Sequence, residues 1–195
     1  MTVAIGAVEL REEILLHMAI FSGFRPGEML ALQRRHISGD AKVVKVEQRV
    51  YRGVIDAPKT NPSRREVAIP PRTAELLRKW MNTAVNPEAN SYVFASEKGT
   101  PIWRDTLMYD HIRPKLKPHG LEWVNFQVMR RTHASIGHRL KLDPKVTAKA
   151  AIVSVWRSRS TQGPPLRIGA VAAKKLEESV LGKRKAVRIP RPKES

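Results

Sequence analysis

The stretch Gly23-Phe24-Arg25-Pro26-Gly27-Glu28 stands between two segments of helical periodicity. Before it, residues 8–22 place apolar side chains every three to four positions, which predicts a helix with one buried face. The first glycine ends that helix, and the proline suits the first turn of a second one. The two helices therefore meet at a tight corner, where Arg25 can reach a phosphate and Glu28 can steady the turn. An ordinary surface arginine in a helix connection is the alternative.

The periodicity changes after this corner. Residues 43–55 carry β-branched side chains in short runs and predict two strands, with turn residues at 38–40 and 52–53. A loop at 58–63 and a third strand at 66–69 complete a small three-stranded antiparallel sheet. Further helices are predicted at 73–81, at 103–116 with a disruption at Pro114, at 126–140, from Asp143-Pro144 onward and at 170–181. This order of elements indicates a mostly helical α+β protein.

Charge and composition restrict the class of partner. The 195 residues include 36 Lys or Arg against 18 Asp or Glu, a formal net charge of +18, and 42% of them are hydrophobic. A folded and very basic protein favours polyanions, nucleic acid first. The sequence has no cysteine, which excludes disulfide scaffolds, thiolate zinc sites and cysteine nucleophiles. The histidines lack the His-Glu-x-x-His spacing, so we expect no metal site.

No stretch predicts a membrane span or a secretory signal. The longest apolar run, residues 14–24, is interrupted by His17 and Ser22, and it is shorter than the roughly 20 residues that a membrane-spanning helix needs. Acidic residues precede this run, where a secretory signal would have a basic region. We therefore expect a cytoplasmic protein without a membrane partner.

A loop between two predicted strands gathers cations. It contains Lys59, Arg64 and Arg65 among small polar residues. A hairpin tip of this kind can enter a DNA groove or direct a lysine at a phosphate oxygen. Solvated charge on a hairpin is the alternative.

The helix predicted at 126–140 has a polar face. Gln127, Arg130 and Arg131 share this face, while Met129 and Ile136 point inward. A solvated helix surface explains the same pattern. Three tryptophans, Trp80, Trp103 and Trp123, are expected in the core, with stacking on nucleic-acid bases as the alternative.

Together these segments resemble the catalytic domain of tyrosine recombinases of the phage-integrase type. That family has a Gly-Leu-Arg-x-Gly-Glu corner, similar to residues 23–28, followed by an apolar helix and a three-stranded sheet. Its Ser-Arg-Arg-x-Val-x-Ile-Pro strand is close to residues 63–70, and its Phe-His-x-x-Arg-His-Thr helix start is close to residues 126–132. An Asp-Pro-Lys-Val match follows at 143–146. The resemblance covers residues 8–149 and depends on the order of the four matches.

The resemblance implies a cut-and-rejoin reaction on double-stranded DNA, in which a tyrosine attacks the scissile phosphate and stays joined to it. Arg25 and Arg130 match the paired arginines that neutralise the non-bridging oxygens, and Lys59 matches the lysine that protonates the leaving oxygen. No metal or cofactor is needed, because the phosphotyrosyl link keeps the bond energy. Gln127 and Arg131 stand where the family usually has histidine, and a glutamine cannot shuttle a proton near neutral pH.

The family's nucleophile has no counterpart in this sequence. Tyr51, Tyr92 and Tyr109 are the three tyrosines, and all precede Arg130, whereas the family places its nucleophile beyond the second arginine. We divide the chain into a catalytic-domain-like region, 1–149, and a segment at 150–195 that contains a short helix and a basic tail. Residues 150–168 match neither the family motif nor a helix, and we hypothesise that they come from a shifted reading frame.

The sequence thus predicts a DNA-binding protein of the integrase type, related to DNA integration and recombination, that is inactive in cis. One alternative is a recombinase whose tyrosine comes from a full-length recombinase protomer. Another is a basic nucleic-acid-binding module without catalysis. The family's separate DNA-clamping domain has no expected counterpart, since the catalytic region begins almost at Met1. Convergence of Arg25, Lys59 and Arg130 on one basic concavity would distinguish the recombinase-like predictions from the module.

Overall fold

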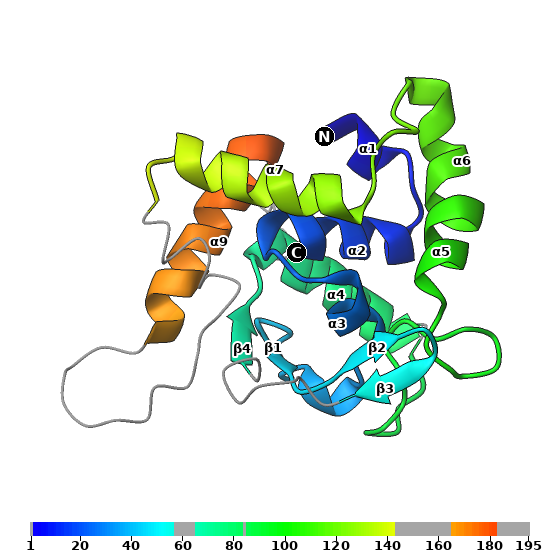
Figure 1. Cartoon of the computed structure of the whole chain (residues 1–195). Coiled ribbons are helices and arrows are strands. Elements are labelled where there is room, and N and C mark those ends of the chain that lie inside the picture. The colour runs from blue at the N-terminus through cyan, green and yellow to red at the C-terminus, as the bar shows by residue number, and fades with distance from the viewer. Residues whose placement is uncertain (1, 57–64, 84, 143–164, 183–195) are drawn as a thin grey trace, which may run out of the picture.

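The structure is a computed structural model that describes residues 2–56, 65–83, 85–142 and 165–182, with side chains in the last range from Ala170 onward. In the view of Figure 1, α7 (Phe126–Arg139) lies along the top and α2 (Leu10–Phe21) runs below it, while α9 (Pro165–Leu181) stands on the left. The remaining elements are α1 (Thr2–Gly6), α3 (Pro26–Leu30), η1 (Arg34–His36), β1 (Val43–Val46), β2 (Arg49–Tyr51), β3 (Val54–Asp56), β4 (Arg65–Ala68), α4 (Pro71–Thr83), α5 (Arg104–Thr106), the π-helix η3 (Leu107–Ile112), α6 (Arg113–Leu116) and η4 (Lys117–His119).

Helix α2 forms the centre of the core. The sequence predicted a helix with one buried face, but every residue from Ile14 to Phe21 is buried. The reason is that α2 packs against α1, α4, α7 and α9, which surround it. A helix that is covered on all sides needs no polar face.

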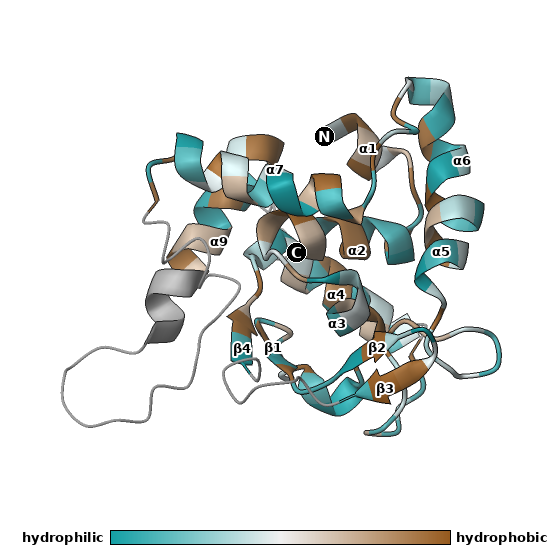
Figure 2. Ribbon diagram, in the orientation of Figure 1, coloured by the Kyte–Doolittle hydropathy of each residue, from teal (hydrophilic) through white to brown (hydrophobic). Residues whose placement is uncertain are grey.

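The predicted three-stranded sheet was wrong, although the α+β class is confirmed. The four described strands form two antiparallel pairs, β1 with β4 and β2 with β3. Between β1 and β2, the Gln48 side chain donates to the Ala31 carbonyl at 2.7 Å, which ties the chain to the end of α3. The run that we predicted as one sheet is therefore divided, and the hydrophobic β3 lies at the periphery (Figure 2).

A disruption of the helix was predicted at Pro114, but the structure shows none. The chain stays helical from Arg104 to Leu116, with the π-helix η3 immediately before α6. A proline inside an α-helix lacks one amide hydrogen and clashes with the carbonyl four residues earlier. The wider π turn shifts that carbonyl away and allows the helix to continue.

The predicted helices at 73–81 and 170–181 are confirmed, the second with an earlier start at Pro165. Glu177 joins them, because its carboxylate accepts hydrogen bonds from the backbone N–H of Arg72 at 3.0 Å and of Thr73 at 2.9 Å. The helix predicted from Asp143 and the sequence at 150–164 lie outside the described residues. Among the helices that the structure describes, none is long and apolar enough to cross a membrane.

Candidate functional site

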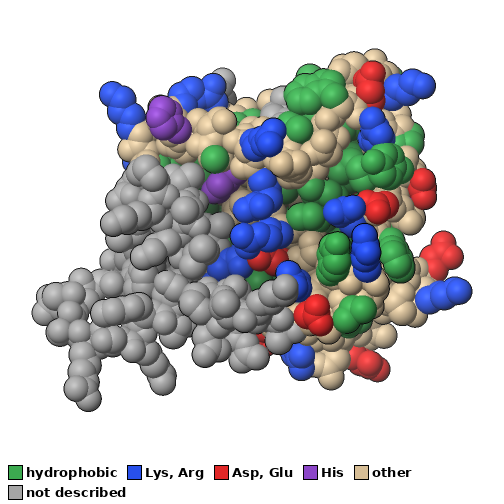
Figure 3. All heavy atoms as spheres, in the orientation of Figure 1, with side chains coloured by type: hydrophobic (Ala, Val, Ile, Leu, Met, Phe, Trp, Pro, Cys, Tyr) green, Lys and Arg blue, Asp and Glu red, His purple; other side chains and the backbone are tan. Residues whose placement is uncertain are grey.

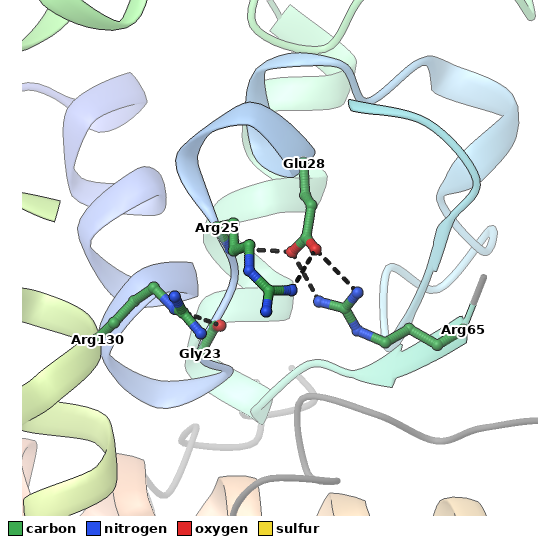
Figure 4. Close-up of polar contacts among 5 residues, drawn as sticks. All are labelled: Gly23, Arg25, Glu28, Arg65 and Arg130. Atoms are coloured by element: carbon green, nitrogen blue, oxygen red, sulfur yellow. Dashed lines mark hydrogen bonds and ion pairs between the residues drawn. The ribbon is translucent and has the colours of Figure 1, made fainter. Parts of the chain in front are cut away.

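Glu28 builds the corner between α2 and α3. The backbone N–H of Arg25 donates to Oε2 of Glu28 at 2.9 Å, and Arg25 Nη1 donates to Oε1 at 3.1 Å. From β4, Arg65 donates to the same carboxylate through Nη1 and Nη2, at 2.9 and 2.7 Å (Figure 4). Glu28 therefore links the helix corner to a strand, and it leaves the Arg25 side chain 59% exposed.

The Glu28 carboxyl is held in its charged form. Its burial alone would raise the pKa of Glu28, but the hydrogen bonds and charge of Arg65, together with the bonds from Arg25, outweigh burial and hold that pKa below its usual range. Arg65 is only 5% exposed, so the carboxylate also compensates a buried cation. The guanidinium of Arg65 holds Glu28 in this structure, and its predicted contact with DNA stays a prediction.

Helix α7 brings a second arginine to this corner. The Asn125 side chain caps α7 by accepting from the backbone N–H groups of Gln127 and Val128, both at 3.0 Å. Further along α7, His133 Nδ1 donates to the Ile20 carbonyl at 2.9 Å and ties the buried face of α7 to α2. The register of α7 against α2 is thereby set.

In this register, Arg130 lies beside Arg25 (Figure 4). Arg130 Nε donates to the Gly23 carbonyl at 3.3 Å, and the side chains that the structure describes place no carboxylate within ion-pair distance of Arg130. Partial burial lowers the pKa of Arg130 and the positive charge of Arg25 lowers it further, while Glu28 acts in the opposite direction. Guanidinium groups stay protonated at neutral pH, so an anion between these two would relieve their repulsion.

Arg25 and Arg130 line one cleft with a volume of about 440 Å³. Its walls come from the corner, from α7, from the β2–β3 hairpin and from residues 101–105, which lead into α5. On the face that Figure 3 shows, Lys and Arg side chains gather with hydrophobic side chains among them. The charged residues of the lining are Arg25, Arg49, Arg52, Arg104, Arg130, Glu28 and Asp105.

The cleft has an excess of positive charge. Of its two carboxylates, Glu28 is bound by Arg25 and Arg65, and Asp105 is bound by Arg104 at 2.8 Å. Arg130 and the exposed part of Arg25 are left facing the cleft. Such a concavity attracts anions, and paired guanidinium groups match the geometry of phosphate oxygens.

Gly27 allows the β2–β3 hairpin to close against the corner. A Cβ at position 27 would lie 2.5 Å from the Val50 carbonyl oxygen in β2. Real Cβ atoms do not approach a carbonyl so closely, so only glycine fits without a shift of the hairpin. The requirement for glycine at position 27 comes from this contact with a distant strand, so the motif alone does not explain it.

The structure describes only part of the predicted set. Lys59 and Arg64 lie outside the described residues, between β3 and β4. Gln127 and Arg131 are exposed on α7 but do not belong to the cleft lining. The roles of all four in binding or catalysis stay predictions.

Several residues of the cleft were not predicted from the sequence, Arg52 and Trp103 among them. Arg52 was noted only as part of a turn, although a cation between two apolar strands is a signal for a ligand-facing hairpin. Trp103 was expected in the core and is exposed, as is Trp123, whereas Trp80 is half-buried and donates to the Val93 carbonyl at 2.7 Å. Among the side chains that the structure describes, no three His, Asp or Glu residues are grouped as metal ligands.

Comparison with known proteins agrees with the resemblance to integrases. The model of the phage integrase family matches residues 2–151. Among solved structures, the chain is similar to the Tn1549 transposon integrase in complex with transposon right-end DNA, with 14% identity and a TM-score of 0.61, over 88% of this chain and 59% of that one. A complex of the same integrase with a circular intermediate DNA gives 17% identity and a TM-score of 0.60, over 77% and 56% of the two chains.

This chain thus spans little more than half the length of those structures, and at such identities the likeness shows the fold. No curated protein matches the chain. The mostly helical architecture with small antiparallel sheets agrees with the predicted integrase-type fold.

Proposed function

The chain belongs to the phage integrase family, and we propose that its cleft binds a backbone phosphate of double-stranded DNA between Arg25 and Arg130. One observation carries the proposal: two guanidinium groups from distant parts of the sequence line one cleft whose carboxylates already have cationic partners. The Tn1549 integrase structures that this chain resembles are complexes with DNA, which supports DNA as the polyanion.

The two arginines are held differently, and this suits two oxygens of one phosphate. Arg25 is oriented by Glu28 through one Nη, so its other donors are directed outward. Arg130 is held through Nε by the Gly23 carbonyl, which leaves its two Nη groups for a ligand. Fixed donors of this kind stabilise the negative charge that builds on non-bridging oxygens during phosphoryl transfer.

Lys59 is proposed as the proton donor to the leaving oxygen. This role comes from the family resemblance, in which the lysine lies in the loop between two strands. In this chain that loop follows β3, whose hairpin with β2 forms one wall of the cleft.

We also propose that this polypeptide does not cleave DNA by itself. Its three tyrosines all precede Arg130, whereas the family resemblance places the nucleophile after the second arginine. The alternative is a tyrosine supplied by a full-length recombinase protomer. Mixing the two proteins on a nicked DNA substrate distinguishes them, since only the second arrangement produces a covalent DNA adduct that depends on Arg25 and Arg130 of this chain.

The origin of residues 150–168 remains a separate proposal. We propose that a shifted reading frame produced residues 150–168; helix α9 begins within this stretch, at Pro165, and packs on β4, α2 and α7. Resequencing the gene tests this proposal. An intact frame, with the same stretch in close relatives, would refute it.

The binding proposal is tested by the salt dependence of affinity for duplex DNA. Arg25→Ala and Arg130→Ala should each weaken binding and reduce the slope of log affinity against log salt by up to about one, the value for one lost phosphate contact. Arg78→Ala is a matched control, because Arg78 is an exposed arginine of α4 that does not line the cleft. Equal affinities for both cleft variants and the unmodified protein would contradict a phosphate-binding role.

A further inference from the structure

Two exposed aromatic rings line the far wall of the cleft. Tyr51, the last residue of β2, is 58% exposed, and Trp103, just before α5, is 60% exposed. Val54 pairs with Tyr51 across the β2–β3 hairpin and is also exposed. Exposed apolar groups that cluster on a cleft wall indicate a surface with a ligand.

The hairpin turn positions the Trp103 ring. A Cβ at Gly53 would lie 3.4 Å from Cζ2 of Trp103, so the ring rests against this turn. The guanidinium carbon of Arg52, in the same turn, lies 5.5 Å from the centroid of the Tyr51 ring. We call Tyr51 and Trp103, with the turn between them, the aromatic lip.

We propose that the aromatic lip stacks on unpaired nucleobases of the DNA strand whose phosphate is held by Arg25 and Arg130. This inference rests on the proposed function of the cleft. An unpaired strand presents a flat apolar base, which the aromatic lip can stack on, beside a phosphate, which the two arginines can bind. Bases inside a duplex are stacked on one another and do not present their faces.

The size and charge of the cleft support this ligand. A hollow of about 440 Å³ falls within the roughly 300–1,000 Å³ of pockets that enclose small organic groups, whereas a duplex backbone needs only a shallow surface. A second copy of the chain is a poor occupant, because both molecules would carry a formal +18.

The test compares the affinity of the full chain for two DNA probes, a duplex and the same duplex with a central stretch of mismatched bases. We expect the protein to prefer the mismatched probe. Trp103→Ala and Tyr51→Ala should each reduce that preference by about tenfold, and Trp103→Phe should retain most of it, since each stacked base contributes on that scale. Trp123→Ala and Tyr109→Ala are matched controls, because these rings are similarly exposed but do not line the cleft.

A second readout detects stacking directly. The fluorescence of 2-aminopurine in the mismatched stretch should be quenched by the unmodified protein and by Trp123→Ala, and much less by Trp103→Ala. Equal affinity for both probes, or lip variants that behave like their controls, would overturn the inference. A change in self-association of the lip variants with unchanged DNA preference would also overturn it, because the lip would then be a protein interface.

The outcome separates this inference from the proposed function. A protein that binds duplex DNA through Arg25 and Arg130, but shows no preference for mismatched DNA, refutes the lip alone. A protein that binds neither probe refutes both.

Discussion

Glu28 and Glu177 are both buried carboxylates, but their partners differ in kind. Glu28 accepts from the guanidinium groups of Arg25 and Arg65, at the edge of the cleft. Glu177 accepts from two backbone N–H groups at the start of α4 and from the Thr73 hydroxyl at 2.7 Å. Glu28 is therefore left with an excess of cations beside it, whereas the Glu177 site is satisfied mainly by dipoles.

A buried carboxylate therefore has two different roles in this molecule, set by the kind of partner that binds it. The arginines around Glu28 carry more positive charge than this carboxylate neutralises, and Arg130 adds to the excess, which attracts an anionic ligand. Around Glu177, hydrogen bonds from two backbone N–H groups and one hydroxyl stabilise the carboxylate. These bonds join α9 to α4. The first region is expected to matter for binding and stability, the second for stability alone.

The largest effect should come from Glu28→Gln. This change removes the carboxylate charge that pairs with the buried Arg65 at 2.7 Å, and breaking a buried ion pair costs about 3–5 kcal/mol. The free energy of unfolding in urea measures the loss. Arg25→Ala, at an exposed partner of the same carboxylate, should cost far less, and equal costs for the two variants would contradict this assignment.

Gly27→Ala should damage the cleft while leaving every charge in place. The added methyl group would meet the Val50 carbonyl, and relief of such overpacking costs about 1–3 kcal/mol. We expect lower stability together with weaker DNA binding. Gly39→Ala is the control, because a Cβ there meets nothing within 4 Å. Wild-type affinity in Gly27→Ala would mean that the position of the hairpin is unimportant.

Glu177→Gln should separate the two regions. Loss of the charge-assisted hydrogen bonds to Arg72 and Thr73 is expected to cost about 1–3 kcal/mol. Duplex DNA affinity, measured well below the unfolding temperature, should stay at the wild-type value, in contrast to Arg130→Ala. A loss of affinity without a loss of stability would contradict the role of Glu177 as a joint.

A smaller and graded effect is expected with pH. Burial would raise the pKa of Glu177, but the nearby His17 side chain and the hydrogen bonds from Thr73 and the backbone outweigh it and lower that pKa, as the arginines do for Glu28. Both carboxyls bind protons more weakly in the folded than in the unfolded chain, so their stabilisation is complete at a pH above the ordinary pKa of a glutamate and is lost as the pH falls through the lowered pKa of the folded chain. Unfolding free energies measured across this range should fall with acid, and less steeply in Glu177→Gln.

The parts of the site that could be predicted from the sequence are those that follow from local pattern. The Gly23-to-Glu28 corner and the α7 helix depend on helix caps and apolar spacing within a few residues, and both are present. The division of the strands into two pairs, β1 with β4 and β2 with β3, depends on contacts between distant residues, which no local pattern indicates.

The position of Arg65 carried a signal that we did not use. Successive strand residues point to opposite faces, so Arg65 shares its face with Val67, and both are buried. Strand alternation therefore favours a buried position for Arg65. The exposure of Trp103 had no such signal, because it depends on how the β2–β3 hairpin meets the start of α5.

The central claim, that Arg25 and Arg130 hold one phosphate, is tested most directly by the salt dependence of duplex binding in the double variant Arg25→Ala/Arg130→Ala. Two cations on one phosphate account for the counterions of a single contact, so the slope should fall by about one in total, no more than in the more affected single variant. A fall of about two, the sum of two independent contacts, would show that the arginines bind separate phosphates and would contradict the account.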